Sequence, residues 1–144
     1  MRVVLDTNQI VAAGTTWGVR GAPASATLAQ RLLNHIADNH TGLLCGEILG
    51  EYVAKLIDGG HPTPRVLAFM GWILGAFERV TVVSTNCDPL PADDDDTIFL
   101  LCAIDGQAHL LVTEDGHLLA LAPAYNNPRI LDRANAAPQL GVPA

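Results

Sequence analysis

Acidic side chains stand at the ends of apolar segments in this sequence, where they could bind a metal ion. Asp6 ends the run VVL, and Asp115 follows LLVTE. Residues 93–96 are four aspartates that lead into an apolar segment, and Glu47 and Glu51 lie one helical turn apart. Asp6 is the most informative of these residues. A carboxylate at the tip of a buried strand needs a partner or a metal ion to offset its loss of hydration.

Carboxylates gathered from separate segments favour Mg²⁺ or Mn²⁺ over zinc, because both ions prefer oxygen ligands. Such an ion can activate a water molecule for in-line attack on a phosphodiester and stabilise the leaving oxygen. Without the ion the carboxylates would repel one another, so we expect at least one raised pKa. None of the histidines stands in a recognisable motif. His117 is the nearest to these acids in sequence, and we assign it no catalytic role.

Each acidic residue also has a simpler interpretation, which the sequence leaves open. One aspartate of residues 93–96 could be the N-cap of the following helix, where the helix dipole favours negative charge. Asp115 and Gly116 could form an ordinary turn, and Glu51 could pair with Lys55 on the same helix face. The acids are more informative together, because like charges converge only when a cation holds them.

The elements that must position these acids alternate between strands and helices. Gly and Pro mark residues 14–24 as a loop, and Ser25 is a plausible helix N-cap. The spacing of apolar residues predicts strands at 2–5, 43–45, 79–84, 110–112 and 130–131, and helices at 26–39, 46–57, 64–77, 98–104 and 117–122. This order predicts an α/β fold with a mostly parallel sheet and helices on both faces. In such sheets, sites form beyond the carboxyl ends of the strands.

The composition indicates one domain with an aliphatic core. The chain has 144 residues, of which 49% are hydrophobic and only 5% aromatic. We expect a single domain over residues 1–135 and a frayed C-terminal tail over 136–144. The three cysteines are widely spaced, which argues against a disulfide framework or a structural zinc site. No apolar run reaches the roughly 18 residues that span a bilayer, so we expect a cytoplasmic protein with no membrane contact.

The net charge of −7 argues against a polyanionic partner, because proteins that bind nucleic acids are usually basic. Two bound Mg²⁺ would add four positive charges and leave −3, which weakens this objection. Arg20, in the Gly-rich loop after the first strand, is the best candidate for a contact to phosphate, and Arg65 is a weaker one. With only eight basic residues in the chain, we expect weak general affinity for nucleic acids.

Three segments of the sequence together resemble the PIN-domain family. They are VVLDTNQIVAA, EILGEYVAKL and DDDDTIFLLCAIDGQAHLLVTED, and the resemblance extends over residues 2–135. Within the family, the chain is most similar to the VapC-like branch, the toxins of bacterial toxin–antitoxin pairs. The resemblance implies a three-layer α/β/α fold and a Mg²⁺- or Mn²⁺-dependent ribonuclease. It also implies a homodimer and a cognate antitoxin partner.

The resemblance assigns site residues position by position. The four acids that would bind metal and perform catalysis are Asp6, Glu51, Asp96 and Asp115, with Asp96 selected by its spacing to Phe99. Asn8 and Thr113 match positions that support the metal ligands through hydrogen bonds. Because the acidic run is longer than usual, Asp93, Asp94 or Asp95 could share or replace the role of Asp96.

One departure from the family pattern concerns Glu114, which stands where the family more often has glycine. This glutamate adds negative charge beside the site and could reach a metal or a water molecule. Two other functions remain open. The chain could be an inactive PIN-like scaffold that binds a partner protein, or a Mg²⁺-dependent phosphohydrolase with Asp6 as nucleophile.

Overall fold

A sheet of five parallel strands forms the centre of the computed structural model, which describes residues 1–18 and 26–144. The strand order is β3-β2-β1-β4-β5, and every neighbouring pair is parallel. The strands are β1 (Arg2–Leu5), β2 (Thr41–Leu44), β3 (Glu78–Arg79), β4 (Leu110–Val112) and β5 (Arg129–Leu131). β1 is the central strand, so the residue after it lies in the middle of the sheet edge.

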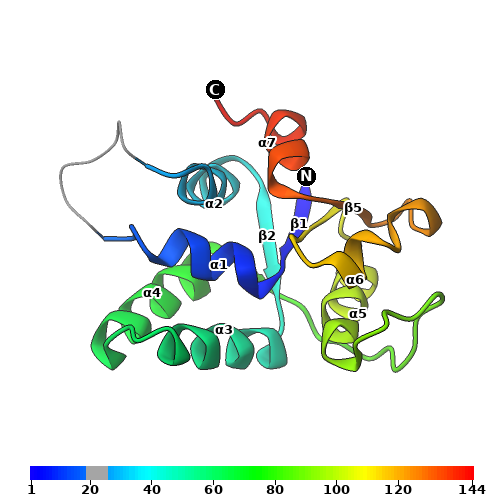
Figure 1. The fold of residues 1–144 in the computed structure, drawn as a ribbon, viewed down its shortest axis with the longest axis horizontal. Helices are drawn as coiled ribbons and strands as arrows, with labels where there is room; N and C mark the ends of the chain where they lie inside the picture. The colour runs from blue at the N-terminus through cyan, green and yellow to red at the C-terminus, as the bar shows by residue number, and fades with distance from the viewer. Residues whose placement is uncertain (19–25) are drawn as a thin grey trace.

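Helices cover both faces of this sheet and complete three layers (Figure 1). α1 and α2 lie on one side of β1 and β2, while α5 packs against β1, β2 and β4 from the other side. The helices are α1 (Thr7–Gly14), α2 (Leu28–Asn39), α3 (Gly46–Asp58), α4 (Thr63–Ala76), α5 (Thr97–Asp105), α6 (Gly116–Leu119) and α7 (Arg133–Leu140). The α/β class and the three-layer fold are confirmed.

The strands are apolar because both of their faces are covered. Val3, Val4 and Leu111 have no exposed surface, as continuous hydrophobic strands of a parallel sheet should. Tyr52 of α3 is also fully buried and donates from its hydroxyl to the Leu5 carbonyl, at 2.5 Å. This bond fixes α3 against the end of β1, the same edge that carries Asp6.

The predicted strand at 79–84 is wrong beyond its first residue. Only Glu78 and Arg79 pair with β2, although the Val80 amide still donates to the Leu44 carbonyl at 2.7 Å. The amides of Val83 and Ser84 donate instead to Asp105 of α5, both at 2.8 Å. A side chain therefore satisfies the donors that a longer strand would have paired, and the β-branched pattern could not reveal this competitor.

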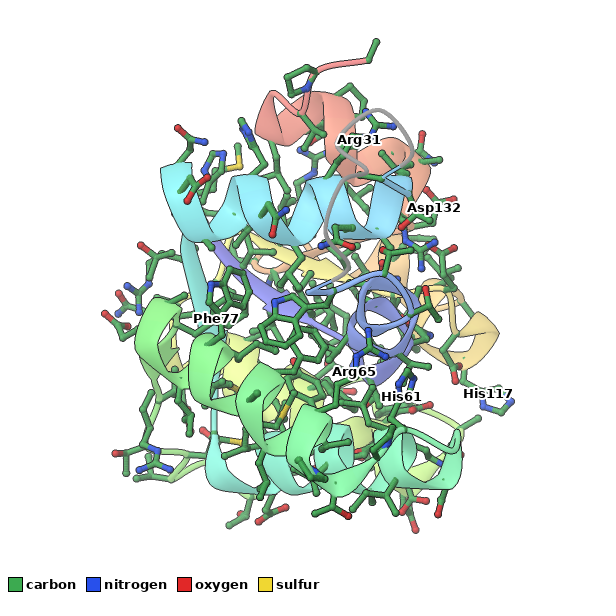
Figure 2. The ribbon with its side chains drawn as sticks, turned by 90° about the vertical axis from the view of Figure 1, so that its left-hand side faces the viewer. Arg31, His61, Arg65, Phe77, His117 and Asp132 are labelled. Carbon is green, nitrogen blue, oxygen red and sulfur yellow. The ribbon has the colours of Figure 1, made fainter. Side chains whose placement is uncertain are left out.

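The predicted frayed tail is also wrong, because α7 continues to Leu140 and packs against α2. The Asp132 side chain caps its first turn by accepting from the Asn135 amide, and Figure 2 labels Asp132 at this end of the helix. Gly141, at φ +79°, ends the helix in the left-handed conformation. Ala136, Ala137 and Leu140 are buried. The helix crosses the boundary that we expected at residue 135.

α1 is an additional helix that the sequence analysis did not predict. The Asp6 carboxylate is its N-cap and accepts from the Thr7 amide at 2.6 Å. The helix has only eight residues, so its apolar spacing is too short to give a clear period. Among the described residues, no helix is long and apolar enough to cross a membrane.

Candidate metal centre

Asp6 is held in a fixed orientation at the carboxyl edge of the sheet. Its side chain is 4% exposed, and its Oδ1 accepts from the Thr7 amide. Its Oδ2 accepts from the Thr113 hydroxyl at 2.6 Å and from Asn8 Nδ2 at 3.2 Å. Thr113 follows the neighbouring strand β4 and is fully buried. The parallel pairing of β1 and β4 therefore brings these residues, 107 positions apart in sequence, into contact.

The other three predicted acids reach the same place from different elements. Glu51 comes from α3, Asp96 from the 3₁₀ turn before α5, and Asp115 from the N-cap of α6. All four acids line one open cavity of about 390 Å³. Asp93 and Asp95 line it as well, so the acidic run contributes more than one carboxylate.

The pKa values of Asp6, Glu51 and Asp96 are raised, as expected for crowded carboxylates. Burial is the largest cause for Asp6 and Glu51, and nearby negative charges add to it. Burial also raises the pKa of Asp96 to about 6, with further contributions from Asp115, Asp6 and Asp93. Repulsion between the carboxylates therefore contributes to the raised pKa values, but the loss of hydration on burial contributes more.

The donor set fits a divalent cation that prefers oxygen ligands. The Oδ2 of Asp96 and the Oγ1 of Thr7 are buried without a hydrogen-bond partner among the described residues. A buried carboxylate oxygen that lacks a donor is costly, and a cation would satisfy it. Carboxylates of this kind suit Mg²⁺ or Mn²⁺.

His117, to which the sequence assigned no catalytic role, lies beside two of the acids. Its Nδ1 is 4.0 Å from Asp96 Oδ2 and 3.8 Å from Asp115 Oδ1. Potential ligand atoms of Asp93, Asp96 and His117 all lie within 4.8 Å of one another. Figure 2 shows His117 at the edge of the molecule, where its side chain is 58% exposed. No sequence motif surrounds this histidine. Its position a few residues after β4, close behind Asp115, was the only signal in the sequence that it could lie near the acids.

The predicted supporting residues lie in different parts of the centre. Asn8 and Thr113 donate directly to Asp6, as described above. Asp95 is exposed at the cavity wall, and its amide donates to Asp93. Arg20 and Ser25 lie outside the described residues.

Arg65, the weaker candidate for a phosphate contact, is occupied elsewhere. Its Nη2 donates to the carbonyls of Gly14 and Trp17, both at 2.7 Å, and its Nη1 contacts His61 (Figure 2). The guanidinium thus binds carbonyls at and just after the C-terminus of α1, and this prediction is wrong. Lys55 of α3 is instead the cation that the described residues bring to the acidic cavity.

Glu114, which the sequence places between Thr113 and Asp115, turns away from the metal centre. Its Oε1 accepts from the Arg133 amide at 2.9 Å and from Gln9 Nε2 at 3.3 Å. It does not line the acidic cavity among the described residues. The expectation that this carboxylate reaches a metal is therefore not supported by its position.

Comparisons with known proteins agree with this geometry. Residues 2–117 match the PIN domain family, whose members are generally nucleases. The fold is similar to a chain in the crystal structure of VapBC2 from Rickettsia felis bound to a DNA fragment from their promoter. The TM-score is 0.59 at 19% identity, over 92% of this chain and 97% of that chain. No curated protein matches the sequence. The family match covers most of the chain and includes all four clustered acids: this protein belongs to the PIN domain family.

Proposed function

We propose that this protein is a Mg²⁺- or Mn²⁺-dependent endoribonuclease and the toxin of a toxin–antitoxin pair. The observation that carries the proposal is the convergence of Asp6, Glu51, Asp96 and Asp115 on one cavity. These acids come from four separate elements, and the raised pKa values of Asp6, Glu51 and Asp96 mark an arrangement that is unfavourable without a cation. Membership of the PIN domain family supports hydrolysis of nucleic acids.

In this mechanism the four acids would hold one or two ions, with Asp93 and His117 close enough to assist. A bound ion would supply positive charge that offsets the phosphate charge and would activate water for in-line attack. Thr113 and Asn8 keep Asp6 Oδ2 aimed in one direction. Asp96 is deprotonated above its pKa of about 6, so the centre is ready for a cation at neutral pH.

Lys55 is the residue that we assign to the substrate phosphate. It lines the acidic cavity and the adjoining cavity of about 380 Å³, which Glu47, Glu51, Asp94 and Asp95 also line. Within the part of the chain that the structure describes, its ammonium group forms no ion pair. A lysine without a partner, beside so many carboxylates, can accept a backbone phosphate as the RNA enters.

The two alternative functions have less support. A scaffold that binds only protein would have no use for buried carboxylates that repel one another. A phosphohydrolase with Asp6 as nucleophile would need a free oxygen, but both oxygens of Asp6 accept hydrogen bonds and the side chain is 4% exposed.

The direct test is cleavage of labelled RNA and of DNA with the same sequence, with Mg²⁺, with Mn²⁺ or with EDTA. The Asp6→Asn, Asp96→Asn double variant serves as the inactive form, and Asp38→Asn, on the exposed surface of α2, is the matched control. We expect metal-dependent cleavage of RNA by wild type and Asp38→Asn only. Equal cleavage by the double variant would identify a contaminant. Preferential cleavage of DNA would refute the ribonuclease assignment.

The two partners implied by the resemblance, an antitoxin and a second copy of the chain, belong to the same proposal. The structural similarity to a chain of a VapBC2 assembly supports a small antitoxin partner encoded nearby. For the homodimer, α4 offers apolar surface, since Leu67 is 63% and Leu74 43% exposed. The apolar residues Ala29, Leu32, Leu33 and Ile36 of α2 are buried in the core, so this helix offers less apolar surface for a contact. Co-expression with the adjacent small reading frame and light scattering of the purified chain test these two proposals, and a lone monomer in both experiments would contradict them.

A further inference from the structure

A hydrogen-bonded network lies behind Asp6 and joins it to the start of α7. Asn8 donates from Nδ2 to Asp6, and Asn8 Oδ1 accepts from Gln9 Nε2 at 3.0 Å. Gln9 Oε1 in turn accepts from Arg133 Nε at 2.8 Å. Glu114 completes the network by accepting from Gln9 Nε2 and from the Arg133 amide. Three segments of the chain, residues 6–9, Glu114 and Arg133, thus meet in one set of polar contacts.

The network permits only one orientation of the Asn8 amide. Gln9 is 2% exposed, and its amide donates and accepts at the same time. Because Gln9 Oε1 is bound to Arg133, the Gln9 NH₂ group must face Asn8 Oδ1. The Glu114 amide also points at this oxygen, at 3.4 Å. A reversed Asn8 would place its NH₂ group against two donors and its oxygen against the Asp6 carboxylate.

Arg133 is itself fixed by the helix that it begins. Asp132 caps α7 at the Asn135 amide, and at the other end both His35 Nε2 and His40 Nε2 contact the Leu140 carbonyl, at 2.9 and 2.8 Å. The side chain of Arg133 is 23% exposed, and its Nε also lies 3.9 Å from Glu114 Oε1. The guanidinium is therefore anchored to an ordered helix rather than to a flexible end.

We propose that Arg133 and Glu114 are positioning residues, which act through Gln9 and Asn8 to hold the Asp6 carboxylate in the orientation that binds a divalent cation. This inference rests on the proposed function, and it assigns a role to the C-terminal helix. It also gives a use to Glu114, whose carboxylate supports the metal centre from behind.

The test measures Mn²⁺ binding by electron paramagnetic resonance, without RNA, in the full chain. Glu114→Met removes the acceptor, whereas Glu114→Gln removes the same charge but keeps an acceptor oxygen. We expect Glu114→Met to weaken Mn²⁺ binding about 10-fold or more relative to Glu114→Gln, as for other residues that orient metal ligands. The side chain of Glu114 is 41% exposed, so both variants should fold.

Arg133→Met gives a second test in which charge and geometry predict opposite results. Loss of a cation near the centre should strengthen cation binding by electrostatics alone, but loss of orientation should weaken it. Arg129→Met, which removes an exposed arginine bound to Gln139, controls for the change in net charge. We expect weaker binding in Arg133→Met only. The loss should disappear in an Asn8→Ala background, where nothing transmits the orientation to Asp6.

The outcomes separate this inference from the function on which it rests. If wild type binds no Mn²⁺ with measurable affinity, the proposed function fails and the inference fails with it. If wild type binds Mn²⁺ but Glu114→Met matches Glu114→Gln, the positioning role is refuted and the metal centre stands. An effect of Arg133→Met that persists unchanged in Asn8→Ala also refutes it.

Discussion

The amino and carboxyl edges of the sheet both carry charged residues, but the fold shifts the pKa values of their acids in opposite directions. At the amino edge, Arg2 pairs with Glu78 and donates from Nε to the Gly106 carbonyl at 2.8 Å. Its backbone amide donates to His109 Nδ1 at 2.9 Å. The Arg2 hydrogen bond is the main reason why the pKa of Glu78 is lowered. At the carboxyl edge, the pKa values of Asp6 and Asp96 are raised.

Cavity size does not distinguish these edges. A cavity of about 350 Å³ lies at the amino edge, close to the volume of the acidic one. The difference is that Arg2 and Glu78 form an ion pair at the amino edge, whereas the acids that line the cavity at the carboxyl edge all carry negative charge. Paired charges are explained by structure alone, and unpaired buried charges indicate a ligand that the folded chain is built to bind.

The largest expected effect comes from the removal of one acid at the carboxyl edge. Asp6→Asn keeps the shape of the side chain but removes the charge that would hold the ion. We expect RNA cleavage to fall by roughly 10³-fold, because a metal ligand supplies several kcal/mol of transition-state stabilisation. Glu78→Gln, the equivalent change at the amino edge, should leave cleavage unchanged. A similar loss in both variants would remove the distinction between the edges.

The pH dependence of metal binding should follow Asp96. Its pKa is raised to about 6, and a carboxylate must lose its proton before it binds a cation. Mn²⁺ affinity should therefore fall as the pH drops below this value, by up to about tenfold for each pH unit. Calorimetric titrations at about pH 5 and about pH 7.5 check this prediction. Equal affinity at both pH values would show that Asp96 does not bind the ion.

A substitution of Lys55 tests whether a basic side chain at the carboxyl edge contributes to RNA binding. Lys55→Gln should raise KM several-fold with little change in kcat, because the contact acts on binding of the backbone. The salt slope of binding to single-stranded RNA should decrease by about 0.7, the value for one phosphate contact. Arg79→Gln, at an exposed position of the edge strand β3 that does not line the acidic cavity among the described residues, is the control. Identical slopes in both variants would exclude the contact.

The smallest expected effect is on stability, where the two edges should respond to pH in opposite directions. Because the folded pKa of Asp96 is raised, the metal-free protein loses stability as the pH rises from about 4 to about 6. Asp96→Asn should remove this loss and raise Tm near neutral pH, by roughly 2–4 °C for each kcal/mol relieved.

Glu78 has a lowered pKa, so its contribution to stability is present above its ordinary pKa and disappears in acid. Glu78→Gln should lower Tm slightly near neutral pH and have no effect at low pH, because exposed ion pairs contribute little. Thermal melts followed by circular dichroism, without metal, compare the two variants. A change of the same sign in both would contradict the contrast between the edges.

The sequence predicted the elements whose patterns are local. The apolar strand before Asp6 and the stripe on α3 that places Glu51 both follow from spacing. It could not predict α7, because Pro138 lies inside the helix and its length is only eight residues. Asp132 at the N-cap and Gly141 after the last turn were the available signals.

The parts of the site that the sequence missed depend on contacts between distant segments. His117 lies beside Asp96 only because β4 runs next to β1 and α5 packs across both. Glu114 turns toward Arg133 because α7 begins there, which no local pattern reveals. The sequence alone suggests that Arg65 is a free surface cation, but in the fold it donates to the carbonyls of Gly14 and Trp17 at the C-terminus of α1.

The central claim is that the carboxyl edge of the sheet holds a divalent cation through acids from separate elements. Its most direct test is a Mn²⁺ titration of the wild-type chain, the Asp6→Asn, Asp96→Asn double variant and Glu78→Gln. We predict saturable binding in wild type and Glu78→Gln, and its loss in the double variant. Saturable binding that survives in the double variant, or no binding in wild type, would contradict the claim.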